Sequence, residues 1–257
     1  MALNADEIYN MHPNNRRSVI LENAGLCSGD SFPDDITKIS NCINSFIDDY
    51  FDICINADST RPNGSILSPH NIERAFMEEV KKFKPQAKSE MAAMVRRFSN
   101  KVESPVNIYE LSGAYTMASA NKLTRTLSTT LGLLWERLAD ISPYGINPEK
   151  EFNLKIKGID AIVKNKNTGN IEHCQIKTQK NTLTGSQTGR SVSELQVHNN
   201  PVFCACFDLG SWTFNHPHIP RVAGSDFWNR IGIDYDMVVN VLSTLLSELE
   251  DEYRGMV

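Results

Sequence analysis

Three polar side chains in the middle of the chain, Asp160, Gln175 and Lys177, have the types and the spacing of a hydrolytic site. Gln175 and Lys177 are two residues apart, so on a β-strand they project from the same face. A hairpin that pairs this strand with the segment carrying Asp160 brings a carboxylate, an amide oxygen and an ammonium group together. This set of groups suits hydrolysis of a phosphodiester bond.

Mg²⁺ is the cofactor that these groups predict, because it is a hard cation that prefers oxygen ligands and keeps several waters. The side chains of Asp160 and Gln175 and the backbone carbonyl of Ile176 can supply such oxygens. Lys177 can then orient or help to deprotonate the attacking water and stabilise the charge that builds on phosphorus. The alternative is a surface hairpin on which ordinary polar residues alternate.

Helices dominate the secondary structure expected before this region. Those with clear patterns span 36–54, 71–83 and roughly 89–101, and Pro85 separates the last two. The strongest pattern covers 119–141, where leucines recur at spacings of four and three along one helical face.

After residue 148 the apolar period shortens to about two, which predicts strands. The expected order is strands 152–158, 159–165 and 171–179, a short helix 191–198, a buried strand 201–209 and a closing helix 234–253. The polar, glycine-containing segment 165–170 supplies a hairpin turn. We therefore expect an α/β fold with a core over 119–257 and a helical N-terminal extension over 1–118, in the same domain or as a subdomain.

The charge of the chain is unevenly distributed. The net charge is −5, with −7 in residues 1–60 and −5 in residues 225–257. Residues 152–190 instead contain seven basic and two acidic residues, a local net charge of +5. This asymmetry predicts a basic surface around the candidate site and a polyanionic partner.

The polar loop that follows Lys177 is the first candidate for contacts to DNA. Its amides, hydroxyls and cations can bind phosphates and base edges. The residues that we select are Lys180, Asn181, Gln187 and Arg190. A second candidate is a basic helix with Lys81, Lys82, Lys84, Lys88, Arg96, Arg97 and Lys101. The alternatives are a flexible polar loop and a solvated helix face.

The order of these elements, with Gly158-Ile159-Asp160 and Gln175-Ile176-Lys177, resembles the PD-(D/E)XK nuclease superfamily, in particular type II restriction endonucleases. The resemblance covers about 119–250, and the segment VAGSDFWNRIGID (222–234) looks like one that follows the core in several restriction enzymes. It implies a restriction-endonuclease-like fold, a mixed central sheet flanked by helices. In two places the chain departs from the motif: Ile159 replaces proline, and Gln175 replaces an acid.

By this resemblance, Asp160 is the central metal-binding carboxylate, Gln175 takes the place of the second acid and Lys177 is the catalytic lysine. Many of these nucleases add an acid from the helix before the sheet, and Glu136 is the candidate. On a helix Glu136 lies nearly opposite the leucine stripe, with Arg125, Thr129 and Gly132. A solvated Glu136 is the alternative, and the weaker candidates Glu151 and Glu172 are expected to be surface charges of the hairpin.

The function implied is Mg²⁺-dependent, sequence-specific cleavage of double-stranded DNA. A homodimer is expected, because cutting both strands of a palindrome with one site per subunit requires two-fold symmetry. The N-terminal region, 1–118, would serve in DNA contact or dimerisation. The alternatives are a repair or mobile-element nuclease of the same superfamily, and a non-catalytic DNA-binding domain with a degenerate site.

No apolar segment approaches the ~18 residues of a membrane helix, and the first residues lack the pattern of a signal peptide. We therefore expect a cytoplasmic protein without a membrane partner.

Overall fold

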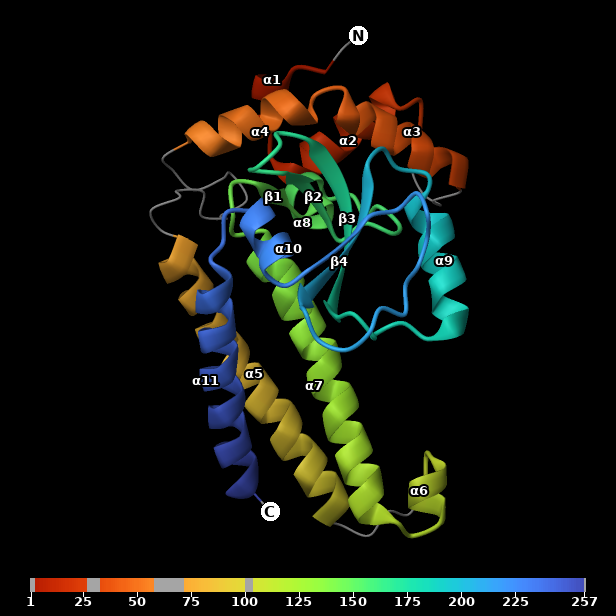
Figure 1. Cartoon of the computed structure of the whole chain (residues 1–257), viewed down its shortest axis with the longest axis vertical. Helices are drawn as coiled ribbons and strands as arrows, with labels where there is room; N and C mark the ends of the chain where they lie inside the picture. The colour runs from red at the N-terminus through yellow and green to blue at the C-terminus, as the bar shows by residue number, and fades with distance from the viewer. Residues whose placement is uncertain (1–2, 27–32, 58–71, 100–103, 257) are drawn as a thin grey trace. The chain divides into compact units, whose positions relative to one another are not determined.

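The computed structural model describes residues 3–26, 33–57, 72–99 and 104–256. These residues form 11 helices and one five-stranded sheet (Figure 1). The chain divides into two compact units: Met1–Ala75 with Trp135–Tyr235, and Phe76–Leu134 with Asp236–Val257. In the first unit, the N-terminal helices share a hydrophobic core with the sheet.

The sheet of the first unit is mixed, as the sequence predicts. Its strands, in spatial order, are β1 (Gly145–Ile146), β2 (Ala161–Lys164), β3 (Ile171–Gln179), β4 (Pro201–Phe207) and β5 (Arg221–Ala223). The pairs β1–β2 and β2–β3 are antiparallel, and the pairs β3–β4 and β4–β5 are parallel. Strand β4 is buried along almost its whole length, which explains its continuous apolar sequence.

The β2–β3 hairpin confirms the predicted turn. Asn165 and Asn170 face each other across it, with an N–H to carbonyl hydrogen bond of 2.9 Å. Gly169 adopts a left-handed conformation with φ of 75°, which glycine reaches without a steric cost. The turn places Ala161 opposite Cys174 in the register.

The predicted strand 152–158 is wrong. Helix α8 (Pro148–Phe152) occupies its start, because the Asn147 side chain accepts hydrogen bonds from two N–H groups of the first turn. The residues after α8 pair with no strand in the described sheet. Their alternation is nevertheless real, since Leu154 and Ile156 are both buried in the core.

Four N-terminal helices cover one side of the sheet in Figure 1. They are α1 (Ala5–Asn10), α2 (Pro13–Asn23), α3 (Pro33–Asn44) and α4 (Ile47–Asn56). Their apolar side chains, including Ile20 and Phe46, join Phe152 and Ile162 in one hydrophobic core. The single helix expected over 36–54 is interrupted, because Phe46 leaves the helical region at φ −134°.

The remaining helices of this unit are α9 (Gly185–Leu195) and α10 (Ser225–Arg230). Helix α9 begins earlier than the predicted 191–198, because Thr184 and Gln187 form a capping box. It joins a small core in which Phe203 stacks on Phe214 at 4.1 Å. In α10, Trp228 donates a 2.8 Å hydrogen bond to the Cys206 carbonyl of β4.

The second unit is helical. It contains most of α5 (Ile72–Ser99) and α7 (Tyr115–Ala139), with α6 (Ile108–Leu111) and α11 (Tyr235–Arg254). The predictions over 119–141 and 234–253 are confirmed within a few residues. The two helices expected on either side of Pro85 are instead the single helix α5. Buried Phe83 and Ala87 lie on either side of this proline, so packing continues across it.

Among the described residues, no helix has the length and apolar character needed to span a membrane.

Candidate active site

Asp160 is held at the start of β2 by the backbone of β3. Its N–H donates a 2.9 Å hydrogen bond to the Cys174 carbonyl. Its Oδ2 accepts a 2.7 Å hydrogen bond from the Ile176 N–H. These two bonds fix the carboxylate beside the middle of β3, and its side chain is 24% exposed.

Lys177 lies beside this carboxylate, with its Nζ 3.8 Å from Asp160 Oδ2. In the β3–β4 register, Gln175 pairs with Phe203 and Lys177 with Ala205, so the two polar residues share one face of the sheet. Asp160 comes one residue before Ala161, which is opposite Cys174. Because side chains alternate along a strand, Asp160 lies on the same face as Gln175 and Lys177. The structure thus brings Asp160, Gln175 and Lys177 together.

Gln175 carries an unsatisfied polar atom. Its side chain is 7% exposed, and its Oε1 accepts no hydrogen bond from any residue that the structure describes. An unpaired acceptor of this kind costs about 1–3 kcal/mol. A buried acceptor without a donor calls for a partner such as a water, an ion or a ligand.

Glu136, in the last turn of α7, also belongs to this site. Burial and then the negative charge of Asp160 raise its pKa to about 7, while Lys177 acts in the opposite direction. The Cys206 thiol of β4 is affected by the same two carboxylates. Burial raises its pKa, and the charges of Glu136 and Asp160 raise it further. Glu136 is therefore a half-buried member of the site.

Asp160 has a raised pKa because burial penalises its charged form, although Lys177 and the Ile176 N–H favour that form. Burial makes both Asp160 and Glu136 costly to ionise, and a bound cation would stabilise their charged forms. The oxygens available are those of Asp160, Glu136 and Gln175 Oε1. The described residues contain no group of three or more His, Cys, Asp and Glu side chains placed to hold a metal.

The Ile176 carbonyl completes this donor set. The N–H and C=O of one strand residue point to the same side of the strand, and the Ile176 N–H points at Asp160. Within the described register, the β2 pairing ends at Ala161 and Cys174 and leaves Ile176 beyond it. The oxygen donors fit a hard cation such as Mg²⁺.

The expectation that Glu151 and Glu172 are surface charges is wrong. Glu151 is fully buried, and its Oε1 accepts a 2.5 Å hydrogen bond from Arg16 Nη1. Glu172 is also buried and contacts Asn165 and Arg230. Both carboxylates are occupied by structural partners, because the N-terminal helices and α10 cover positions that look exposed in an isolated hairpin.

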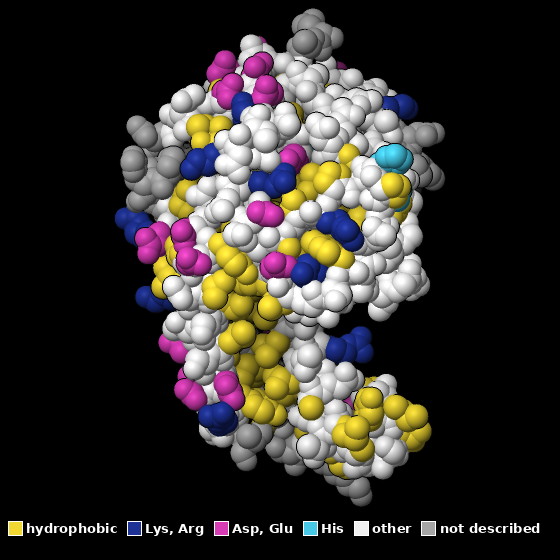
Figure 2. Space-filling view, in the orientation of Figure 1, with side chains coloured by type: hydrophobic (Ala, Val, Ile, Leu, Met, Phe, Trp, Pro, Cys, Tyr) yellow, Lys and Arg dark blue, Asp and Glu magenta, His cyan; other side chains and the backbone are white. Residues whose placement is uncertain are grey.

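The four residues predicted to contact DNA lie in the turn that follows β3 and on α9. Lys180 pairs with Asp208 at 2.5 Å, and Arg190 pairs with Glu194 at 2.7 Å. Gln187 Oε1 accepts from the Thr184 N–H, and Asn181 Oδ1 accepts from Gln179. Figure 2 shows acidic and basic side chains interspersed over this unit. Contact of these residues with DNA stays a prediction.

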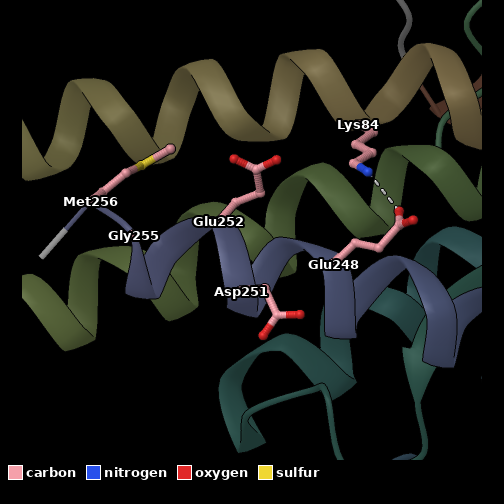
Figure 3. Close-up of a pocket in the computed structure, with 6 residues that line it drawn as sticks. All are labelled: Lys84, Glu248, Asp251, Glu252, Gly255 and Met256. Atoms are coloured by element: carbon pink, nitrogen blue, oxygen red, sulfur yellow. Dashed lines mark hydrogen bonds and ion pairs between the residues drawn. The ribbon is translucent and has the colours of Figure 1, made fainter.

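The basic residues of α5 are largely paired as well. Lys84 binds Glu248 at 2.7 Å, which Figure 3 shows, and Lys88 binds Glu252 at 2.5 Å. Within the same unit, Arg97 contacts Glu110 at 3.1 Å. Lys101 lies outside the described residues.

Gly158 allows the chain to turn just before Asp160. It has φ of +84°, and a Cβ there would lie 2.7 Å from Glu194 Cβ. We expect Gly158→Ala to lower the free energy of unfolding by about 2–4 kcal/mol, from left-handed strain plus overlap. Gly169→Ala is the matched control, since it has φ +75° and nothing within 4 Å; strain alone predicts about 1 kcal/mol. Urea denaturation measures both, and equal losses would contradict the role of the close contact.

Two features of the site carry no signal in the sequence. The anchoring of Asp160 on the Ile176 N–H depends on the hairpin register, and the nearness of the Cys206 thiol depends on how β4 lies beside β3. Comparisons of this chain with protein-family models, with curated proteins and with solved structures found no match.

Proposed function

We propose that this protein is a Mg²⁺-dependent endonuclease that cleaves double-stranded DNA at specific sequences, as type II restriction endonucleases do. The observation that supports the proposal is the group of polar side chains on β3 and directly before β2. Lys177 Nζ lies 3.8 Å from the anchored Asp160 carboxylate, and the buried Gln175 Oε1 next to them lacks a donor among the described residues. In this proposal the enzyme acts as a homodimer.

The residues that would hold Mg²⁺ are Asp160, Gln175 through Oε1 and Ile176 through its carbonyl, with Glu136 as a further carboxylate. A bound Mg²⁺ supplies Lewis-acid chemistry at the phosphate and makes a coordinated water more acidic. The Lys177 ammonium donates a hydrogen bond that orients the attacking water. It also stabilises the negative charge that develops on the phosphate oxygens. Asp160, held by two backbone contacts, keeps this geometry preorganised.

The experiment that tests the proposal incubates plasmid and phage DNA with the full chain in Mg²⁺ or in EDTA. Discrete fragments in Mg²⁺ alone, whose sequenced ends share one motif, are the expected result. Heterogeneous ends would instead favour a repair or mobile-element nuclease. Binding of DNA without cleavage at any Mg²⁺ concentration would favour a non-catalytic binding domain and contradict the proposal.

Gln175→Glu should strengthen metal dependence. The change places a carboxylate oxygen where an unpaired amide oxygen now lies, and ligand charge strongly tunes the affinity for divalent cations. We expect half-maximal cleavage at a Mg²⁺ concentration on the order of tenfold lower. In EDTA the variant should unfold at a lower temperature than the unmodified chain, and Mg²⁺ should restore the difference.

Gln179→Glu is the matched control, because it makes the same chemical change on the same face of β3. Gln179 already donates a hydrogen bond to Asn181, so no shift in Mg²⁺ dependence is expected there. A Gln175→Glu enzyme with an unchanged Mg²⁺ requirement would show that this side chain does not meet the metal.

A further inference from the structure

One face of α7 carries a continuous series of residues that ends at Glu136. Its members, at alternating spacings of three and four, are Lys122, Arg125, Thr129, Gly132 and Glu136. Positions separated by three and four residues lie on the same side of an α-helix. We call the first four of these residues the α7 stripe. The stripe lies in the part of α7 that belongs to the second unit.

The α7 stripe is accessible and has the chemistry of a phosphate-binding surface. Lys122, Arg125 and Thr129 are exposed, and Gly132 is half-exposed. Lysine and arginine supply most charged contacts to nucleic-acid backbones. No acidic residue occurs between Glu110 and Glu136. Residues 115–135 of α7 therefore carry basic side chains without a carboxylate among them.

The two cations of the stripe also differ from four of the other cations predicted to contact DNA. Lys84, Lys88, Lys180 and Arg190 each lie within ion-pair distance of a carboxylate. Across the described ranges, no carboxylate lies within ion-pair distance of Lys122 or Arg125. Their charge is thus available to a ligand.

The other two positions of the stripe, Thr129 and Gly132, leave room for a backbone to approach. The Thr129 hydroxyl folds back to donate a 2.9 Å hydrogen bond to the Arg125 carbonyl, so the side chain stays close to the helix. A Cβ at Gly132 would meet nothing within 4 Å. An exposed glycine inside a helix costs about 1 kcal/mol relative to alanine, and close approach of a ligand backbone is a common reason to keep one.

The length of the stripe matches a short run of duplex. With a rise of about 1.5 Å per residue, Lys122 and Gly132, at the two ends of the stripe, lie roughly 15 Å apart along the helix axis. Phosphates of one DNA strand recur about every 3.4 Å along the duplex axis. The stripe therefore spans on the order of five base pairs.

We propose that the α7 stripe binds the phosphate backbone of a DNA duplex, with Lys122 and Arg125 as its two phosphate contacts. The inference rests on the proposed function, because it assigns the stripe to the DNA that the proposed nuclease would cleave. Lys122 and Arg125 are positioning residues: they hold the duplex and do not touch the reacting phosphate.

The test is the salt dependence of binding of Lys122→Ala/Arg125→Ala to a labelled 25-base-pair duplex in EDTA. Alanine keeps the helix, since it is the strongest helix former. Each lost phosphate contact lowers the slope of log affinity against log salt by about 0.9, so the double variant should lose about 2 from the slope. In Mg²⁺, KM for DNA cleavage should rise at least about tenfold, while kcat stays within about twofold.

Arg17→Ala/Lys38→Ala is the matched control, because it removes the same number of charges from α2 and α3, which contain none of the individual residues predicted to contact DNA. Its salt slope should change by less than about 0.5. An unchanged slope for the stripe variant, or an equal loss in the control, would overturn the inference. The two proposals can be contradicted separately. DNA binding that depends on the stripe, without any cleavage, would contradict only the nuclease assignment. Cleavage with an unchanged salt slope would contradict only the role of the stripe.

Discussion

Asp160→Ala and Lys177→Ala should each reduce Mg²⁺-dependent DNA cleavage by at least about 10³-fold. Asp160 is the anchored carboxylate of the donor set, and Lys177 supplies the one ammonium group 3.8 Å from it. Neither residue contributes a large buried apolar surface, so both variants should fold. DNA binding in EDTA should stay within about threefold, because phosphate contacts elsewhere dominate affinity.

Lys164→Ala is the control for the loss of a lysine from the same hairpin. Its Nζ pairs with Asp48 and Asp52 at 2.8 and 2.5 Å, so cleavage should persist in this variant. Single-turnover rates on a DNA fragment, measured with thermal unfolding of each variant, separate loss of chemistry from loss of fold. Full activity of Asp160→Ala or Lys177→Ala would remove the basis of the nuclease assignment.

Glu151→Ala should lower the free energy of unfolding by about 3–5 kcal/mol, the typical cost of leaving one charge of a buried ion pair alone. The side chains of Arg16 and Glu151 are both completely buried, with 2.5 Å between Nη1 and Oε1. Tyr50 donates to the same Glu151 oxygen, and burial together with the Glu151 charge raises the pKa of Tyr50. This network ties α2 and α4 to α8.

Two variants make this prediction sharp. Glu149→Ala changes the same helix, but Glu149 is 62% exposed and lies 3.9 Å from Lys155, so we expect a loss below about 1 kcal/mol. Arg16→Met combined with Glu151→Leu should recover part of the stability lost in Glu151→Ala, because an apolar pair leaves no unpaired charge, whereas the buried Tyr50 hydroxyl loses both of its partners. A loss below about 1 kcal/mol in Glu151→Ala, measured by urea denaturation, would mean that the buried pair is not needed.

Local patterns predicted the elements that depend on local forces. The leucine stripe of α7, the β2–β3 turn and the apolar run of β4 each report a periodicity or a turn preference within about twenty residues. The proximity of Asp160 and Lys177 could be predicted in the same way, because one hairpin joins them. Contacts within a hairpin need no information about the rest of the chain.

Burial and pairing between distant segments could not be predicted in this way. The alternation in 152–158 indicated a strand, yet these residues pack beneath the N-terminal helices without a strand partner in the described sheet. The sequence predicts an exposed Glu151, because its partner, Arg16, is 135 residues away. It predicts a basic face of α5 that could contact DNA, because Glu248, which pairs with Lys84, is 164 residues away.

The sequence by itself determined the α/β class, the hairpin and the face that Gln175 and Lys177 share, since backbone periodicity and turn chemistry are local properties. Only the tertiary structure decided which charges are free. Lys84 and Arg16 acquire carboxylate partners through folding, whereas Lys122 and Arg125 do not among the described residues. Whether a charge is available to a ligand depends on the three-dimensional neighbours that screen or pair it, and those neighbours come from anywhere in the chain.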